Sequence, residues 1–262
     1  TKEILTVNDL EDYAKFQNAI AGKKKVAILG AGLIGCEFAN DLVLGGYEVD
    51  VIDLASQALG RLIPEIAAKE LQAKLNAAGV RWHFNTTAKS IDRVQNQIQI
   101  TLADGNSLSC DVVLSAIGLK PRIDLAKASG INTGNGIQVN RQLETNAPHI
   151  YAIGDCAEVE GLVLPYVMPI MQAARALAVT LTSQSTPLTY PAMPVMVKTP
   201  ALPTIVSPPA KDVMGTWKTQ EVEGGLEARF ESADGKLLGF VLMGTATAKR
   251  AALAKELPPI LG

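Results

Sequence analysis

The sequence predicts an α/β protein built around a parallel sheet, followed by a shorter mixed segment and by an antiparallel unit. Three observations support this class. Short β-branched runs alternate with helical patterns over the first 118 residues, one such run leads into a Gly-x-Gly-x-x-Gly turn, and the last part of the chain reads as strands separated by glycine-rich turns. Alternating strand and helix patterns are typical of a parallel sheet with helices on its faces.

The first predicted elements follow one another at short intervals. A helix over 8–21 has Asn8 or Asp9 as its cap and acidic residues in its first turn. The elements that follow are a buried strand over 25–29, a helix over 33–44 closed by Gly45 and Gly46, a strand over 47–54, an amphipathic helix over 64–78 and a strand over 80–84.

The pattern changes after these elements. Residues 89–110 alternate around the turn "ADGNS" and predict a three-stranded antiparallel insert, after which 111–118 returns to the sheet as a buried strand. The elements predicted next are a helix over 168–183, extended edge segments or a linker in the proline-dense stretch 187–209, an antiparallel unit over 212–247 and a helix over 246–256.

Composition excludes several classes of protein. The 262 residues carry a net charge of −2, which indicates neither nucleic-acid binding nor attraction to an anionic membrane. No apolar stretch reaches the roughly 18 residues expected of a membrane span. Cys36, Cys110 and Cys156 lack the spacing of a zinc site or a disulfide framework, so we expect no metal site and reduced thiols in a cytoplasmic protein. The oligomeric state is not predicted.

The glycine turn predicts a dinucleotide site. Gly30 permits a tight turn, Gly32 lets the backbone approach a pyrophosphate, and Gly35 lets the helix pack closely on the sheet. Leu33 and Ile34 open the helix, whose free N–H groups and positive dipole end suit phosphate. The alternative is a glycine turn that only packs a helix.

The predicted nucleotide is NADH. Asp53 ends the second strand 23 residues after Gly30 (53 − 30), close to the roughly 20 expected of the acidic residue that binds the ribose. A carboxylate there accepts hydrogen bonds from ribose hydroxyls and repels the 2′-phosphate of NADPH.

Two residues just after the third glycine have less certain roles. Cys36 is expected to pack in the core beneath the helix. Glu37 lies one turn into the helix, where it either faces the nicotinamide end of the cofactor as the candidate catalytic residue, or is a solvated or salt-bridged side chain.

Two later phrases, "AIGLKPR" at 116–122 and "IYAIGDCAE" at 150–158, suggest a second cofactor. Together with the glycine turn they resemble the two-dinucleotide flavoprotein reductases of the glutathione-reductase-like superfamily. The resemblance implies that Gly118 marks the crossing from the NAD domain to the FAD domain. It also implies that Gly154 and a buried Asp155 hold the ribityl chain of FAD.

Longer phrases are similar to the bacterial rubredoxin reductase family: "GAGLIGCEFANDL", "YAIGDCAEVEGL", "PYVMPIMQAARALA" and "MPVMVKTPALP". That resemblance implies transfer of electrons from NADH through FAD to rubredoxin, a small acidic iron protein that serves alkane hydroxylation. It places the stretch from Tyr166 through Val167 to Met168 against the flavin, with plain core packing as the alternative. It places Lys198 near the exposed flavin edge, with a solvated lysine as the alternative.

The chain differs from the family at its start. Such reductases begin with a separate glycine turn for FAD, which this sequence lacks. We therefore expect a fragment with three domains: an NAD domain with its connector over 1–118, a remnant of the FAD domain over 119–188, and a small α+β interface domain over 189–262. An NADH oxidase, a CoA-disulfide reductase and a non-catalytic NAD-binding module remain alternatives.

Two further sets of residues carry weaker expectations. His83 and His149 lie in separate segments and are expected to be structural. Basic side chains that are candidates for a docking surface, or that form only a solvated face, are Lys23, Lys24, Lys25, Lys120, Arg122, Lys198 and Arg250.

Overall fold

The computed structural model describes residues 3–262, except the side chain of Arg61, and the chain folds into two compact units. The first unit combines the chain up to Gly118 with Pro194–Leu253, and the second combines Leu119–Met193 with Ala254–Gly262. None of the helices within residues 3–262 is long and apolar enough to cross a membrane.

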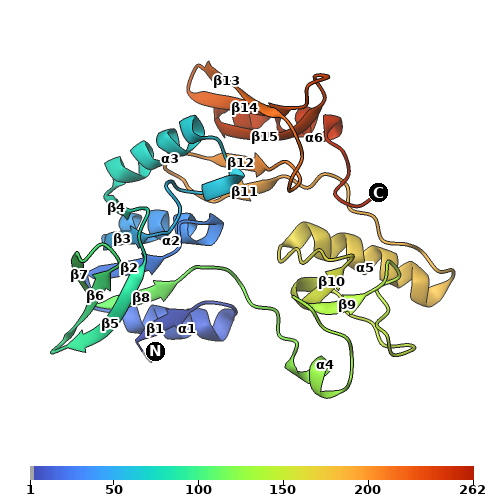
Figure 1. Cartoon of the computed structure of the whole chain (residues 1–262), viewed down its shortest axis with the longest axis horizontal. Coiled ribbons are helices and arrows are strands. Elements are labelled where there is room, and N and C mark those ends of the chain that lie inside the picture. Colours follow the sequence, from blue (N-terminus) through green and yellow to red (C-terminus); the bar gives the residue numbers. More distant parts are fainter. Residues whose placement is uncertain (1–2) are drawn as a thin grey trace. The chain divides into compact units, whose positions relative to one another are not determined.

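A five-stranded parallel sheet forms the centre of the first unit (Figure 1). Every neighbouring pair in it is parallel, as the alternation of strands and helices predicts. The edge strand β1 was not predicted, because three residues are too few to show a period. In spatial order the strands are β1 (Ile4–Thr6), β8 (Val112–Ser115), β2 (Lys25–Leu29), β3 (Glu48–Ile52) and β4 (Val80–His83).

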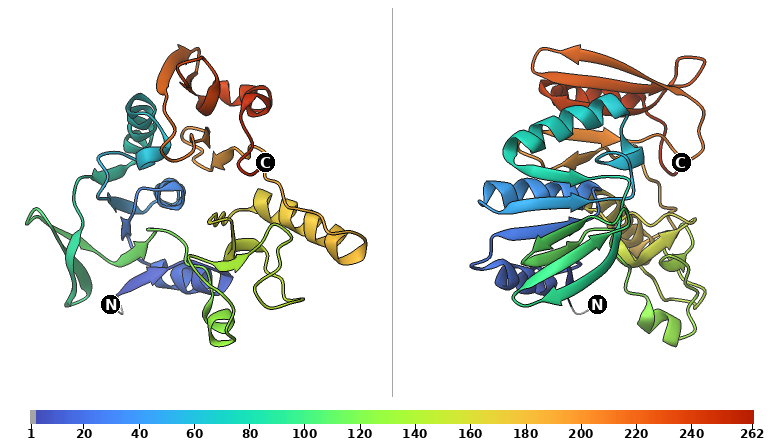
Figure 2. Two further views of the ribbon diagram at one scale, coloured as in Figure 1. Left: turned by 45° about the vertical axis from the view of Figure 1, so that its right-hand side comes forward. Right: turned by 60° about the vertical axis from the view of Figure 1, so that its left-hand side comes forward.

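Different elements cover the two faces of this sheet. The helices α1 (Leu10–Ile20), α2 (Leu33–Leu44) and α3 (Glu65–Ala78) share one hydrophobic cluster with alternate strand residues such as Val49 and Val51. On the opposite face, Ile98 and Ile100 of the insert pack against other strand residues in a separate cluster. The left view of Figure 2 shows the insert on one side of the sheet and the helices on the other. The insert strands are β5 (Ala88–Val94), β6 (Gln97–Leu102) and β7 (Ser107–Cys110).

Local sequence explains where the helices begin and end. The Asp9 carboxylate accepts a hydrogen bond from the Asp12 amide at 2.7 Å, which identifies Asp9 as the cap of α1. Gly79 follows α3 with a φ of 115°, a left-handed conformation that favours glycine. The strand predicted over 25–29 and the helix predicted over 33–44 are both confirmed at their stated bounds.

A second, antiparallel sheet belongs to the same unit. Its strands in spatial order are β11 (Val195–Val197), β12 (Thr204–Ser207), β15 (Leu237–Gly244), β14 (Gly225–Glu231) and β13 (Thr216–Val222), and η3 (Thr245–Lys249) and α6 (Arg250–Glu256) follow. The prediction of edge segments was right for β11 and wrong for β12, which pairs on both sides. Pro200 and Pro203 lie in the turn between these two strands. No proline therefore removes a backbone hydrogen-bond donor from β12.

The second unit has its own small core. The parallel pair of β9 (Ile137–Val139) and β10 (Ala157–Val159) packs with α5 (Val167–Thr182) around Leu143, Leu188 and Tyr190. The short elements η2 (Gly154–Cys156) and α4 (Asp124–Ala128) complete this unit. The observed architecture confirms the predicted α/β class with a parallel sheet, a three-stranded insert and an antiparallel C-terminal sheet.

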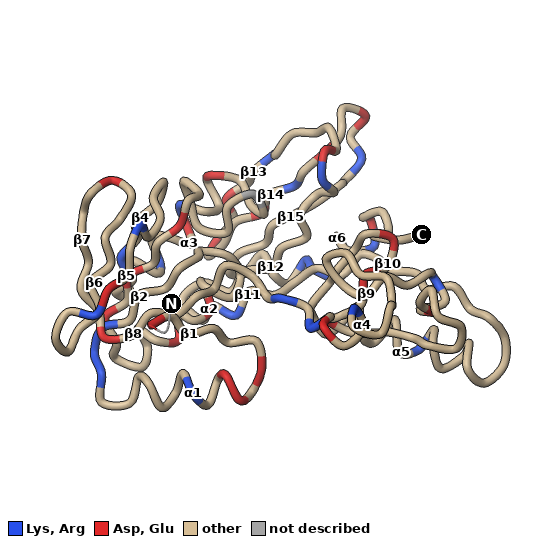
Figure 3. The backbone as a smooth tube through the Cα atoms, turned by 60° about the horizontal axis from the view of Figure 1, so that its bottom comes forward, with Lys and Arg blue, Asp and Glu red and all other residues tan. Residues whose placement is uncertain are grey.

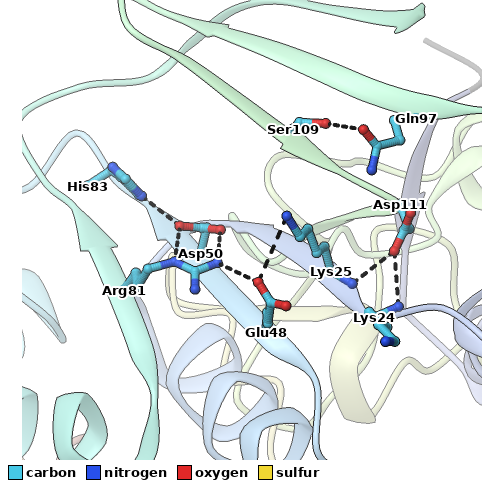
Figure 4. A network of polar contacts seen from close by, with 9 residues as sticks. All are labelled: Lys24, Lys25, Glu48, Asp50, Arg81, His83, Gln97, Ser109 and Asp111. Atoms are coloured by element: carbon cyan, nitrogen blue, oxygen red, sulfur yellow. Dashed lines mark hydrogen bonds and ion pairs between the residues drawn. The ribbon is translucent and has the colours of Figure 1, made fainter. Parts of the chain in front are cut away.

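A charged network lies on the insert side of the parallel sheet (Figure 4). Asp50 is 7% exposed, and its carboxylate accepts hydrogen bonds from Arg81 Nε at 3.0 Å and Nη2 at 2.7 Å. His83 Nε2 lies 2.9 Å from the same carboxylate. Burial alone raises the pKa of Asp50, but the hydrogen bonds from Arg81 and His83 outweigh burial, so the pKa of Asp50 lies below its ordinary value.

We expect Asp50→Asn to lower the free energy of unfolding at pH 7 by about 1–2 kcal/mol, since Arg81 is half-exposed and water screens part of the pair. The pKa of Asp50 is lower in the folded state. Its contribution is therefore complete above the ordinary value of 3.8 and is lost as the pH falls towards the folded-state pKa. Urea unfolding of both proteins at a series of pH values measures this difference.

The matched control for this prediction is Glu65→Gln. Glu65 pairs with Lys69 on the exposed side of α3, and both side chains are more than 70% exposed. We expect Glu65→Gln to cause no measurable change in the free energy of unfolding. A constant difference between wild type and Asp50→Asn across the acid range would contradict the assignment to the Asp50 charge.

Candidate dinucleotide-binding site

Gly30 follows β2 and begins the turn. Its φ is +105°, and a Cβ atom at this position would lie 2.7 Å from the Ala116 carbonyl oxygen. The Ala116 amide in turn donates to the Leu29 carbonyl oxygen at 2.7 Å. Glycine is therefore required here both by the backbone conformation and by the end of β8, which passes directly beside the turn.

Gly35 and Gly32 occupy very different surroundings. A Cβ on Gly35 would lie 2.0 Å from the Gly30 carbonyl oxygen, so helix and turn touch backbone to backbone. A Cβ on Gly32 would meet nothing within 4 Å. The third glycine serves packing, and the second leaves open space beside the turn, as the motif predicts for a bound pyrophosphate.

The first turn of α2 presents backbone donors to that space. Gly32 is the N-cap residue and makes no side-chain hydrogen bond to the helix, and the first intrahelical bond runs from the Cys36 amide to the Gly32 carbonyl oxygen at 2.9 Å. The amides of Leu33 and Ile34 therefore precede the helical ladder. Donors at a positive helix end suit an anionic group. The residues present fit the pyrophosphate of a dinucleotide.

Asp53 is half-buried at the end of β3, beside the turn. One carboxylate oxygen accepts a hydrogen bond from the Ala31 amide, and the other accepts one from the Ala55 amide at 2.7 Å. The carboxylate thus holds the turn in place. Two accepted bonds leave lone pairs on both oxygens, so ribose hydroxyls can still donate to it.

Cys36 is structural. The side chain is fully buried beneath α2, and its thiol donates to the Ala31 carbonyl oxygen at 3.4 Å. Burial raises the pKa of Cys36 to about 12, which keeps the thiol protonated at neutral pH. The prediction that Cys36 packs in the core is confirmed.

The structure brings Glu37 and Lys198 together. The Lys198 amide donates to Glu37 Oε1 at 2.9 Å, and the next polar residue on α2, Asn40, accepts a hydrogen bond from the Ala201 amide at 3.1 Å. Sequence reasoning missed Asn40. A polar residue three positions after Glu37 on an apolar helix was the available signal.

Four of the residues predicted to hold the flavin, Gly154, Asp155, Val167 and Met168, belong to the second unit, and two, Gly118 and Lys198, belong to the first. Gly118 and Gly154 have φ values of +120° and +83°, which favour glycine. Val167 and Met168 are 70% and 43% exposed at the start of α5. The expectation that Asp155 is buried was wrong, because Asp155 is the exposed residue of η2. The roles predicted for these residues stay predictions.

Each histidine contacts a carboxylate. His83 pairs with Asp50, and the His149 amide donates to the Glu144 carboxylate at 2.7 Å. Among residues 3–262, no three His, Cys, Asp or Glu side chains group in a way that could hold a metal ion.

The sequence matches two families along its length. Residues 1–179 match the pyridine nucleotide-disulphide oxidoreductases. The chain belongs to this family. Residues 187–257 match a second description, the rubredoxin binding C-terminal domain.

Curated relatives agree with this assignment. The chain is 49% identical over 260 residues to a rubredoxin-NAD(+) reductase of Alcanivorax borkumensis, covering 99% of this chain and 68% of the relative. It is 50% identical to a protein of the same name from Acinetobacter baylyi, covering 99% and 67%. The chain therefore spans about two thirds of the length of these relatives.

Solved structures share the fold. A ferredoxin reductase from Rhodopseudomonas palustris is similar with a TM-score of 0.84 and 29% identity over 98% of this chain and 66% of that one. A persulfide reductase of A. fulgidus has a TM-score of 0.85 at 20% identity, covering 98% and 53%, and shows the fold alone.

Substitutions of two glycines should separate folding from cofactor binding. Gly35→Ala places a methyl group against the Gly30 carbonyl oxygen, and we expect it to destabilise the fold by about 2 kcal/mol or more. Gly32→Ala meets no atom of the protein. We expect it to retain the wild-type Tm and to weaken NADH binding about tenfold or more, because the methyl group occupies space needed by the pyrophosphate.

Thermal unfolding and NADH titration by fluorescence measure the two effects. If Gly32→Ala binds NADH as tightly as the wild type, the open space beside Gly32 is not the pyrophosphate site. Equal Tm values for Gly35→Ala and wild type would contradict the close approach of helix and turn.

Proposed function

We propose that the protein transfers electrons from NADH through FAD to rubredoxin. The single observation that carries this proposal is the combination, in one chain, of a complete glycine turn on a parallel sheet with a C-terminal sheet that matches the rubredoxin binding domain. The relatives that are about 50% identical to nearly the whole of this chain are named rubredoxin-NAD(+) reductase.

The start of α5 supports a place for the flavin. Tyr166 is the N-cap residue and makes no side-chain hydrogen bond to the helix, so the amides of Val167 and Met168 lack a capping partner. Their exposed apolar side chains stand beside these donors. This combination fits the edge of the flavin ring system, which is partly apolar. The ring gains negative charge on reduction, and the positive end of a helix stabilises that charge. These residues would hold FAD, which would supply the chemistry of accepting a hydride from NADH and releasing single electrons.

The cytoplasmic location expected for the protein remains part of the proposal. The three cysteines form no disulfide in the structure, which is the usual state in a reducing compartment.

Asp53 supports NADH rather than NADPH as the donor. Its carboxylate is fixed by two amides beside the turn, so it cannot swing away from an incoming 2′-phosphate without breaking both hydrogen bonds. A fixed negative charge repels a phosphate more than a mobile one does.

An acceptor other than rubredoxin is supported by the names of further relatives. Relatives from Aeromonas salmonicida and Aeromonas hydrophila, 39% and 37% identical over 98% of this chain, are named nitric oxide reductase FlRd-NAD(+) reductase. The higher identity to the rubredoxin reductases favours rubredoxin.

We expect the full-length flavin-loaded protein to reduce rubredoxin with NADH, at a rate that falls as salt is added because the exposed cation of Lys198 meets an acidic partner. Reduction of the rubredoxin iron, followed by its visible absorbance at increasing ionic strength, tests this. Flavorubredoxin, the candidate acceptor abbreviated FlRd in the names of those relatives, and oxygen serve as competing acceptors. Faster turnover with flavorubredoxin would select the second acceptor, and consumption of NADH with oxygen alone would indicate an NADH oxidase.

We expect Asp53→Asn to reduce the preference for NADH over NADPH about tenfold, since the substitution removes the charge that repels the 2′-phosphate. Flavin reduction by each nucleotide in a stopped-flow instrument gives the ratio. Asp104→Asn, in an exposed turn of the insert, is the control and leaves the ratio as it was. An unchanged ratio in Asp53→Asn would assign to Asp53 only the role of holding the turn.

A further inference from the structure

Helix α2 contacts the C-terminal sheet through two side chains on one face. Glu37 and Asn40 are three residues apart and so point the same way from successive turns. Glu37 accepts the Lys198 amide and Asn40 accepts the Ala201 amide, at 2.9 and 3.1 Å. We call the segment 198–201 the acceptor turn. One helix of the nucleotide-binding region therefore holds both ends of a turn that lies in the rubredoxin binding domain.

The acceptor turn is rigid within itself. Thr199 is 1% exposed, and its hydroxyl donates to the Leu202 carbonyl oxygen at 2.8 Å, while the Leu202 amide donates back to the Thr199 carbonyl oxygen at 2.9 Å. The Gly244 amide donates to the Pro203 carbonyl oxygen at 2.8 Å, which attaches the end of the turn to β15. Val197 and Leu202 also pack in the hydrophobic cluster that α2 shares, and the bonds to Glu37 and Asn40 fix the amides of Lys198 and Ala201 on the helix.

The unpaired amide group of Asn40 lowers the stability of the fold. Its side chain is fully buried, and its Nδ2 donor has no hydrogen-bond partner among residues 3–262. An unsatisfied buried donor costs roughly 1–3 kcal/mol. An apolar side chain would avoid that cost but would leave the Ala201 amide without its acceptor. What Asn40 alone provides is an acceptor for the amide of Ala201.

Lys198 is the charged residue of the acceptor turn. Its amide is fixed by Glu37, its side chain is exposed, and within the described part of the chain its ammonium group forms no ion pair. Lys218 on β13 pairs with Glu231 and Lys249 in η3 pairs with Glu227, whereas Lys236 before β15 resembles Lys198 in having no ion pair within the described residues. Figure 3 shows that acidic and basic residues are otherwise interleaved along the chain. A cation that no carboxylate neutralises is available to an acidic partner.

We propose that Glu37 and Asn40 are positioning residues which hold the acceptor turn on α2 and thereby display the ammonium group of Lys198 to an acidic electron-transfer protein. This inference rests on the proposed function for the identity of that acceptor. Glu37 acts here through its oxygen atom as a hydrogen-bond acceptor and not through its charge.

The test compares variants in the full-length flavin-loaded protein by two readouts. Hydrogen–deuterium exchange of the 195–206 segment reports the amides of Lys198 and Ala201 directly. Steady-state kinetics with rubredoxin separates KM from kcat. Asn40→Ala removes one acceptor, Asn40→Leu removes it while filling more of the volume, and Glu37→Ala removes the other. Glu37→Gln keeps an acceptor oxygen and removes only the charge.

We expect exchange at the affected amide to quicken about tenfold in both Asn40 variants and in Glu37→Ala. In the Asn40 variants the KM for rubredoxin should rise about fivefold with kcat nearly constant. Glu37→Gln should retain wild-type exchange. Lys198→Ala should raise KM without changing exchange and should reduce the dependence of KM on salt. Lys236→Ala removes an exposed lysine in the turn before β15 and should change neither readout.

Two results would overturn the inference. Unchanged exchange in the Asn40 variants and in Glu37→Ala means that α2 does not hold the acceptor turn. Quickened exchange with an unchanged KM for rubredoxin means that the turn does not serve docking. Failure of the wild type to reduce rubredoxin is a different outcome, because it rejects the proposed function while the exchange measurement still tests the contact between α2 and the turn.

Discussion

The contact between Gly35 and the Gly30 carbonyl oxygen is the constraint on which the first unit depends. No side chain larger than hydrogen fits between helix and turn, since even a Cβ would lie 2.0 Å from that oxygen. The contact fixes where α2 begins and how it leaves the sheet. The free amides at its start, the burial of Cys36 and the direction of Glu37 and Asn40 all follow from that one orientation.

Asp53 is the counterpart of this contact on the neighbouring strand. The glycines allow the turn to be tight, and the Asp53 carboxylate then holds it by accepting the Ala31 amide. The Ala55 amide holds the carboxylate from its other side. A residue expected only to recognise the ribose is therefore also part of the scaffold. Preorganisation of this kind lowers the cost of ordering the site when a nucleotide binds.

Sequence reasoning succeeded where one local pattern determines the structure. The strand before the glycines and the helix after them were predicted at their observed bounds, because a β-branched run, a turn motif and a glycine stop act within a few residues of one another. It failed where structure depends on distant partners. The position of β12 inside its sheet follows from pairing with β15, and the bonds of Glu37 and Asn40 each join residues 161 positions apart. No spacing in the sequence contains that information.

The N-terminus of α2 and the side of its first two turns serve different parts of the proposed reaction. Its N-terminus faces the space for a pyrophosphate, and its first two turns hold the acceptor turn. Twelve residues rise only about 18 Å, and a hydrogen-bonded helix of this length moves as one body. A nucleotide that shifts the start of α2 therefore also shifts the positions of Glu37 and Asn40. The resulting coupling is limited by the two hydrogen bonds, at about 1 kcal/mol each, which corresponds to a change in acceptor affinity of no more than about thirtyfold. A coupling larger than this would have to pass through the flavin instead of through the helix.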